Sequence, residues 1–182
     1  MIAKSRKGLI NRFQELSAPV AAHFEHLPRL VFDFPLSVSL AYTFLQLGLA
    51  QNRSLYQGTV KLHKVDAQIT RFAIGSQHMT RKGFESLFLS VFSYPVPQDL
   101  AECLKKAEDV RDQVMHGKNV SEAQIRDAVW NALQYTDGLY AFLQEKNNLR
   151  ICGNSKGFSG RAKKHDRKTS RLILKGLGFS LQ

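Results

Sequence analysis

The spacing of apolar residues, which repeats every three to four positions through most of the chain, constrains the fold most strongly. Between about residues 35 and 146, leucine, isoleucine, valine and phenylalanine recur at this helical period. Such a period places apolar side chains on one face of an α-helix, and no period-2 run of useful length competes with it. Because the helical stretches are separated by short loops, the sequence predicts an all-α helical bundle.

Capping residues and prolines divide the chain into individual helices. Gly75 and Ser76 are a reasonable stop for one of them. Ser121 with Gln124 three residues later is a capping box, which starts the last long helix. The aromatic stripe in the helix after Thr80 is expected to lie in the core. The predicted helices cover about 4–17, 35–51, 53–73, 98–115 and 121–146, with a shorter helix between Thr80 and the prolines at 95 and 97.

Charge is spread unevenly along the 182 residues. The net charge is +11, and residues 150–182 hold nine lysines and arginines against one aspartate, so the rest of the chain is only mildly basic. A balance this basic favours a polyanionic partner such as nucleic acid. We therefore expect two parts. They are a helical domain at 1–148 and a basic, partly irregular arm at 149–182, packed on or extending from it, with one short helix or strand at Arg171–Leu174.

Compartment and cofactor are also constrained by the sequence. Two cysteines make no disulfide framework, and the charged N-terminal residues do not resemble a secretion signal, so a cytoplasmic location is expected. The longest apolar stretch is too short and too polar to span a bilayer. His23 and His26 lack a third ligand nearby, so no metal and no other cofactor is predicted. The basic helix at 4–17 could lie on a membrane surface, but packing of Leu9 and Phe13 against the bundle is the more common arrangement.

One short stretch combines residues that can carry chemistry. Arg111 lies on the apolar stripe four residues after Ala107, so its guanidinium should face a core, a cleft or a partner chain. His116 stands where the helix stops before Gly117, and a helix C-terminus favours imidazolium. Asp112, four residues before His116, could hold the imidazole in one tautomer. Arginine and histidine together suit transfer at a phosphodiester without a metal.

A purely structural interpretation of this stretch is equally simple. Arg111 could form a salt bridge with Glu108 or Asp112, and His116 could serve as a C-terminal cap. An arginine and a histidine five positions apart also occur in helices by chance, so the spacing alone does not establish a site.

The run Arg111-Asp112-Gln113-Val114-Met115-His116 resembles the Arg-polar-x3-His motif of the HEPN family. The resemblance extends over most of 35–146, and the tail from Gly157 to Phe179 resembles a bacterial subgroup of the RiboL-PSP type. It implies an all-α homodimer and, for many members, a metal-independent endoribonuclease whose arginine and histidine meet at the dimer cleft. Cleavage then leaves a cyclic phosphate and a 5′ hydroxyl. Some nuclease members carry a tyrosine two residues after the histidine, where this chain has Lys118.

The resemblance and the basic charge of the arm together set the expected roles of individual residues. Arg111, His116 and Asp112 are the expected catalytic residues. The expected RNA contacts are Lys118 and the arm residues Arg161, Lys163, Lys164, Arg167 and Lys168. Phe158 is a candidate for base stacking, although the arm could equally be a solvated segment pinned to the core. The loop 157–161 gives only a weak phosphate-binding signal, because it lacks the P-loop spacing.

Two classes of function follow from these residues. The first is an endoribonuclease acting in stress response or phage defence, with RNA as substrate and an inhibitory partner protein as a further expectation. The second is a non-catalytic HEPN module that binds nucleotides or another protein through the same dimer face. Neither class requires a membrane.

Overall fold

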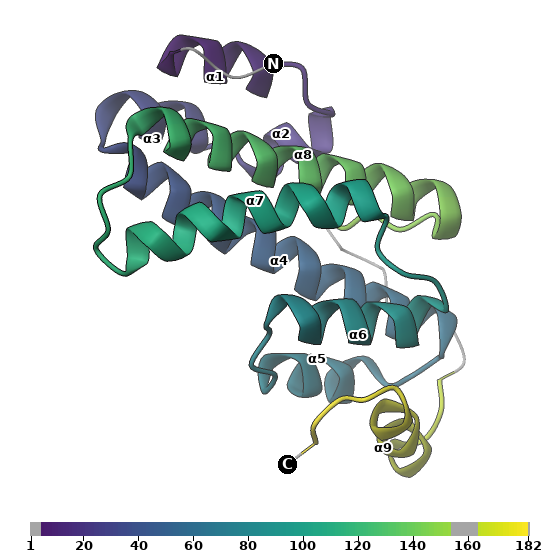
Figure 1. The fold of residues 1–182 in the computed structure, drawn as a ribbon. Coiled ribbons are helices and arrows are strands. Elements are labelled where there is room, and N and C mark those ends of the chain that lie inside the picture. The colour runs from purple at the N-terminus through teal and green to yellow at the C-terminus, as the bar shows by residue number, and fades with distance from the viewer. Residues whose placement is uncertain (1–4, 154–163, 182) are drawn as a thin grey trace.

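The computed structural model describes residues 5–153 and 164–181, which form an all-α bundle (Figure 1). No strand occurs within these two ranges. The helices of the described chain are α1 (Arg6–Phe13), α2 (Ala18–His23), α3 (Leu27–Asp33), α4 (Leu36–Leu62), α5 (Ala67–Gly75), α6 (Arg81–Phe92), α7 (Gln98–Met115), α8 (Glu122–Asn147) and α9 (Arg167–Gly176). None of them is long and apolar enough to cross a membrane.

Helix α4 is the axis of the fold (Figure 1). Its first half packs beside α3 and under α8 and α7, and its second half packs on α5 and α6. The prediction of two helices that meet near residue 52 was wrong, because α4 runs unbroken from Leu36 to Leu62. No glycine or proline stands at 52–53 to stop it. The break comes at Lys64, whose φ of 54° is left-handed, and Asp66 then caps α5 by accepting hydrogen bonds from the backbone of Gln68 and Ile69.

Helices α7 and α8 form an antiparallel pair, and their sequence-predicted bounds are confirmed. Ser121 and Gln124 make the expected capping box at the start of α8. Gly117 reverses the chain between the two helices at a φ of 68°, a conformation that suits glycine. Leu100 and Leu104 of α7 are buried against α8.

Helix α6 lies beside α5 at the other end of α4 and carries the aromatic stripe. Thr80 caps α6 by accepting a hydrogen bond from Gly83 N. Phe84, Phe88 and Phe92 are buried, which confirms that the stripe is core. The rings of Phe88 and Phe92 lie 4.5 Å apart.

The N-terminal helices close the opposite end of the bundle. Leu9, Ile10 and Phe13 of α1 are buried, so the apolar face of this basic helix packs against the protein. Two short helices that the sequence did not predict, α2 and α3, follow. Each has a proline in its first turn, where the missing amide proton costs nothing.

The basic arm returns to the α5–α6 end of the molecule. Leu149, Ile151 and Cys152 are buried directly after α8. Further along, α9 packs on α5 and buries Leu174, so the segment expected as a short helix or strand is a helix, and a longer one. The stacking candidate Phe158, the loop 157–161 and the expected RNA contacts Arg161 and Lys163 lie outside the described residues.

Candidate functional site

Arg111 projects from α7 towards α4. Its guanidinium carbon lies 4.6 Å from the centre of the Phe44 ring, a cation–π contact. The side chain is 34% exposed, so it is neither buried in the core nor free in solvent. The apolar stripe of α7 therefore directs this arginine to an edge of the bundle, where α4 supplies an aromatic platform.

Two carboxylates bind the Arg111 guanidinium. Its Nε and Nη2 donate to Asp112 Oδ1 at 2.9 and 2.7 Å. Its Nη1 lies 3.8 Å from Glu108 Oε1, an ion pair rather than a hydrogen bond. Both pairings of the structural salt-bridge interpretation are thus present.

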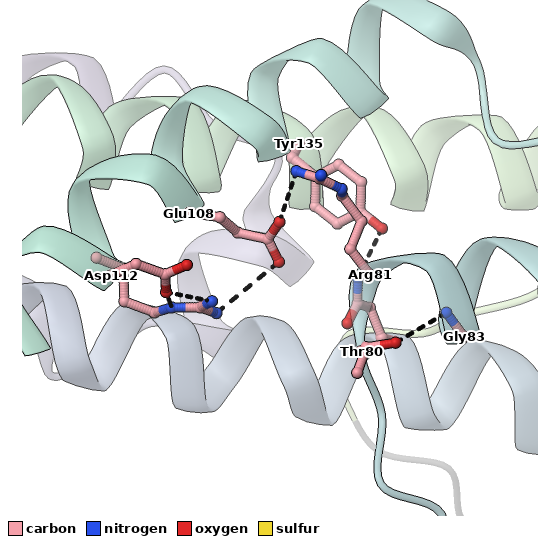
Figure 2. Close-up of polar contacts among 8 residues, drawn as sticks. Thr80, Arg81, Gly83, Glu108, Asp112 and Tyr135 are labelled. Atoms are coloured by element: carbon pink, nitrogen blue, oxygen red, sulfur yellow. Dashed lines mark hydrogen bonds and ion pairs between the residues drawn. The ribbon is translucent and has the colours of Figure 1, made fainter.

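A second arginine reaches Glu108 from α6. Arg81 Nη1 donates to Glu108 Oε2 at 3.0 Å, so Glu108 lies between two guanidinium groups from different helices (Figure 2). Arg81 is the first residue of α6, and the Thr80 cap fixes the turn that carries it (Figure 2). This bridge links α6 to α7 at the base of the site.

Glu108 is the most buried charged group of the cluster, with 15% of its side chain exposed. Burial raises the pKa of its carboxyl, because desolvation outweighs the opposing effect of the Arg111 and Arg81 charges. When Glu108 is ionised, the positive charges of Arg81 and Arg111 balance its negative charge. Its role is therefore to hold both guanidinium groups in place.

Below the charged cluster is a buried polar pair. Gln51 Nε2 donates to the Tyr135 hydroxyl at 2.9 Å, which joins α4 to α8. Tyr135 is 1% exposed, and burial raises the pKa of its hydroxyl far above the ordinary range. Tyr135 is therefore a neutral part of the scaffold.

The cluster borders a cavity of about 170 Å³. Arg111, Glu108 and Arg81 form its charged side, and Thr80 and Asn52 add polar groups. Its wall is completed by Phe44, Leu47, Gly48, Gln51 and Met79. A space of this size admits a small anionic group such as a phosphate, and the arginines offer it donors.

His116 lies at the C-terminal end of α7 and is exposed. It is the residue after the last helical position, and its backbone N–H donates to the Asp112 carbonyl at 3.0 Å. The Asp112 carboxylate binds Arg111 instead, and across 5–153 and 164–181 no hydrogen bond or ion pair joins it to the His116 ring. The structure thus does not bring together the pair that was expected to orient the imidazole.

The expected RNA contacts are divided between two regions of the molecule. Lys118 is exposed in the loop after His116. Arg167 and Lys168 begin α9 and Lys164 precedes it, well apart from the C-terminal end of α7 (Figure 1). Within one chain, α9 therefore does not lie beside Arg111 and His116.

Three residues of the site were not predicted from the sequence as functional, namely Phe44, Arg81 and Glu108. Glu108 was foreseen only as a structural partner, from its position three residues before Arg111. Phe44 and Arg81 come from α4 and α6, and no local pattern marks a contact made across the bundle. Only the packing of helices distant in sequence reveals them.

Neither a metal nor a known relative identifies the site. No group of three or more histidine, cysteine, aspartate or glutamate residues that could hold a metal ion occurs in the part of the chain that the structure describes. Comparisons of this chain with family models, curated proteins and solved structures find no match. Function must therefore be inferred from the chemistry of Arg111, His116 and their neighbours.

Proposed function

We propose that the protein is a metal-independent endoribonuclease of HEPN type that acts as a homodimer through Arg111 and His116. The observation that carries the proposal is the position of Arg111, which α7 presents at the rim of a cavity instead of in the core. His116 stands exposed at the end of the same helix. The two side chains that phosphodiester chemistry needs are therefore both accessible.

Helical geometry supports a site shared between two copies. Residues five positions apart in an α-helix point about 140° away from each other around the axis. Arg111 and His116 of one chain therefore diverge, and a second copy must supply the complementary group at one phosphate. Large apolar side chains are exposed on α7, which carries Arg111, and on the neighbouring α4: Met115 is 73% exposed, Leu45 61% and Leu49 40%. Such side chains suit a contact between copies.

The proposed reaction transfers the phosphoryl group within the RNA chain. The 2′ oxygen of a ribose attacks the adjacent phosphorus, and the bond to the 5′ oxygen of the next nucleotide breaks. One histidine takes the proton from the 2′ hydroxyl, and a second gives a proton to the leaving oxygen. Arg111 stabilises the charge that grows on the phosphate oxygens. The products are a 2′,3′-cyclic phosphate and a 5′ hydroxyl.

Asp112 has a different role from the one the sequence suggested. Its carboxylate fixes the Arg111 guanidinium through two hydrogen bonds, which makes it a positioning residue for the arginine. Because the Asp112 side chain is 56% exposed, it can turn into solvent when a phosphate binds Arg111 in its place. Glu108 then continues to hold the arginine from the buried side.

The second candidate is a non-catalytic HEPN module that uses the same face to bind a nucleotide or a partner protein. It is favoured by the complete pairing of Arg111, which already has two carboxylates and the Phe44 ring. In that case the cluster joins α4, α6 and α7, and His116 is only the helix cap. With the first candidate we also propose RNA as the substrate, an inhibitory partner protein, a cytoplasmic location and a role in stress response or phage defence.

An assay of RNA cleavage in EDTA distinguishes the two candidates. The wild type should degrade mixed RNA with the chelator present, and His116→Ala should lose about 10²–10⁴-fold in rate. His26→Ala is the matched control, because His26 is an exposed histidine at the N-cap of α3, away from α7. Light scattering should show a dimer for all three proteins. A wild type that leaves RNA intact would support the non-catalytic module.

A further inference from the structure

An exposed phenylalanine stands in a groove between α5 and α9. The side chain of Phe72 is 58% exposed, although phenylalanine is usually buried in a small protein. The groove has a volume of about 250 Å³ and is lined by Gln68, Ile69, Phe72, Arg167 and Arg171. The aromatic ring comes from α5 and the two guanidinium groups from α9, so the groove exists only because α9 docks on α5.

The docking of α9 is well defined. Ser170 is buried, and its hydroxyl accepts a hydrogen bond from Asp66 N at 3.0 Å. Leu174, one turn further, is fully buried. Arg167 Nη2 donates to Gln68 Oε1 at 3.1 Å and so leans across the groove. The two helices therefore hold Phe72 and the arginines in a fixed relation.

The surroundings of the groove are strongly basic. Residues 64–76 and 164–176 contain seven lysines and arginines against two aspartates. Both aspartates, Asp66 and Asp166, are occupied as helix caps. No acidic side chain of the described residues pairs with Arg171. The groove thus offers unneutralised positive charge on one side of an exposed ring.

We propose that the α5–α9 groove binds single-stranded RNA, with Phe72 as a platform on which a base stacks and with Arg167 and Arg171 on the flanking phosphates. A ring between cations matches a polyanion whose planar bases alternate with phosphates. This surface goes beyond the proposed endoribonuclease site, because it lies apart from the C-terminal end of α7 and requires no cleavage (Figure 1). The proposed RNA contact of the arm therefore extends from α9 onto α5.

A single-stranded nucleic acid fits this groove better than a membrane surface does. Insertion into a bilayer needs a broad apolar face. Helix α9 turns Leu174 into the protein and exposes only one large apolar side chain, Leu172. One ring and one leucine among seven cations provide little apolar area, whereas one ring suffices to stack a base.

The test measures binding to a 2′-O-methyl RNA oligonucleotide of mixed sequence by fluorescence anisotropy. The methyl group blocks the 2′ oxygen, so the probe stays intact even if the proposed ribonuclease is active. Phe72→Ala should weaken binding about 5- to 150-fold, the range for loss of one stacked base. The slope of log K against log salt should not change in this variant, because no phosphate contact is lost. Phe72→Tyr should bind like the wild type.

Arg171→Ala should give the complementary result. It should flatten the salt dependence by about 0.7 in slope, the value for one phosphate contact with a single strand. The matched controls are Phe32→Ala, an equally exposed ring on α3, and Lys7→Ala, an exposed cation on α1. Both lie at the opposite end of the molecule (Figure 1) and should leave binding unchanged.

Three results would overturn the proposal. The first is full affinity in Phe72→Ala or a loss of the same size in Phe32→Ala. The second is a Phe72→Ala protein that no longer binds anionic vesicles but keeps its affinity for the oligonucleotide. This result would assign the groove to a membrane. The third is a changed oligomeric state with unchanged oligonucleotide binding, which would assign it to a contact between copies. Cleavage of unmodified RNA by the same variants is scored separately, so failure of this site and failure of the ribonuclease proposal remain distinguishable.

Discussion

The crossing of α4 and α6 depends on the absence of a side chain at Gly58. A Cβ added there would lie 2.6 Å from Phe92 Cζ and 2.7 Å from Val91 Cγ1. Carbon atoms in protein cores normally stay about 3.5–4.0 Å apart. Phe92 and Val91 are 5% and 1% exposed, so neither can move into solvent. We therefore expect Gly58→Ala to push the two helices apart by roughly 1 Å.

The magnitude follows from two opposing terms. Overpacking a core by one methyl group typically costs about 1–3 kcal/mol. Alanine gains about 1 kcal/mol over glycine in a helix interior. Gly48 lies in the same helix, and a Cβ there would meet no atom within 4 Å, so Gly48→Ala should be stabilising by about 0.5–1 kcal/mol. Both substitutions gain the same helix propensity. The free energies of unfolding of the two variants should therefore differ by about 1–3 kcal/mol, which is the packing cost alone.

Urea unfolding followed by far-ultraviolet circular dichroism measures this difference. Gly48→Ala should raise the urea midpoint of the wild type. Gly58→Ala should have a free energy of unfolding about 1–3 kcal/mol below that of Gly48→Ala, with the same m-value. Equal stabilisation by both substitutions would refute the reasoning, because it would mean that α4 and α6 do not approach closely at Gly58.

Two further predictions concern the charged cluster and a buried histidine. Glu108→Ala leaves Arg81 and Arg111 facing each other, and it should lower stability by about 1–2 kcal/mol, less than a fully buried pair because both arginines are about one-third exposed. Glu108→Gln should cost less, and urea unfolding measures both losses. Burial lowers the pKa of His23 below its ordinary 6.5. The unfolded chain therefore takes up this proton first, so stability should fall as the pH drops below about 6.5, by up to about 1.4 kcal/mol per pH unit. In His23→Gln, unfolding curves at successive pH values should lack this part of the slope; an identical slope would contradict it.

The sequence predicted those elements whose ends carry strong local signals. Helices α7 and α8 were placed correctly because prolines precede one and a capping box starts the other. The boundary near residue 52 was wrong, because one apolar pattern ends near Gln51 and a second stripe begins after it, whereas Gln51 and Ser54 are buried inside one continuous helix. What ends α4 is a left-handed Lys64, which no sequence pattern announces.

The candidate site was predictable only along its own helix. The apolar stripe of α7 predicted that Arg111 faces a core, a cleft or a partner chain, and the structure places it at the rim of a cavity. Its spacing from Glu108 and Asp112 suggested either ion pair, and both are present. The partners from α4 and α6 required the fold. The expected contact between Asp112 and His116 does not form. His116 lies beyond the last helical residue, and the Asp112 carboxylate accepts hydrogen bonds from the Arg111 guanidinium instead.

The central claim, catalysis by Arg111 and His116, is tested most directly with a DNA oligonucleotide that contains one ribonucleotide, incubated in EDTA. The wild type should cut it once, directly 3′ to the ribose, and leave a 2′,3′-cyclic phosphate. Arg111→Ala and His116→Ala should each slow this cut by about 10²-fold or more while dimer and melting temperature are kept. Arg29→Ala, an exposed arginine in an ion pair on α3, should cut like the wild type. Equal cleavage by all four proteins, or a cut at a deoxyribonucleotide, would contradict the account.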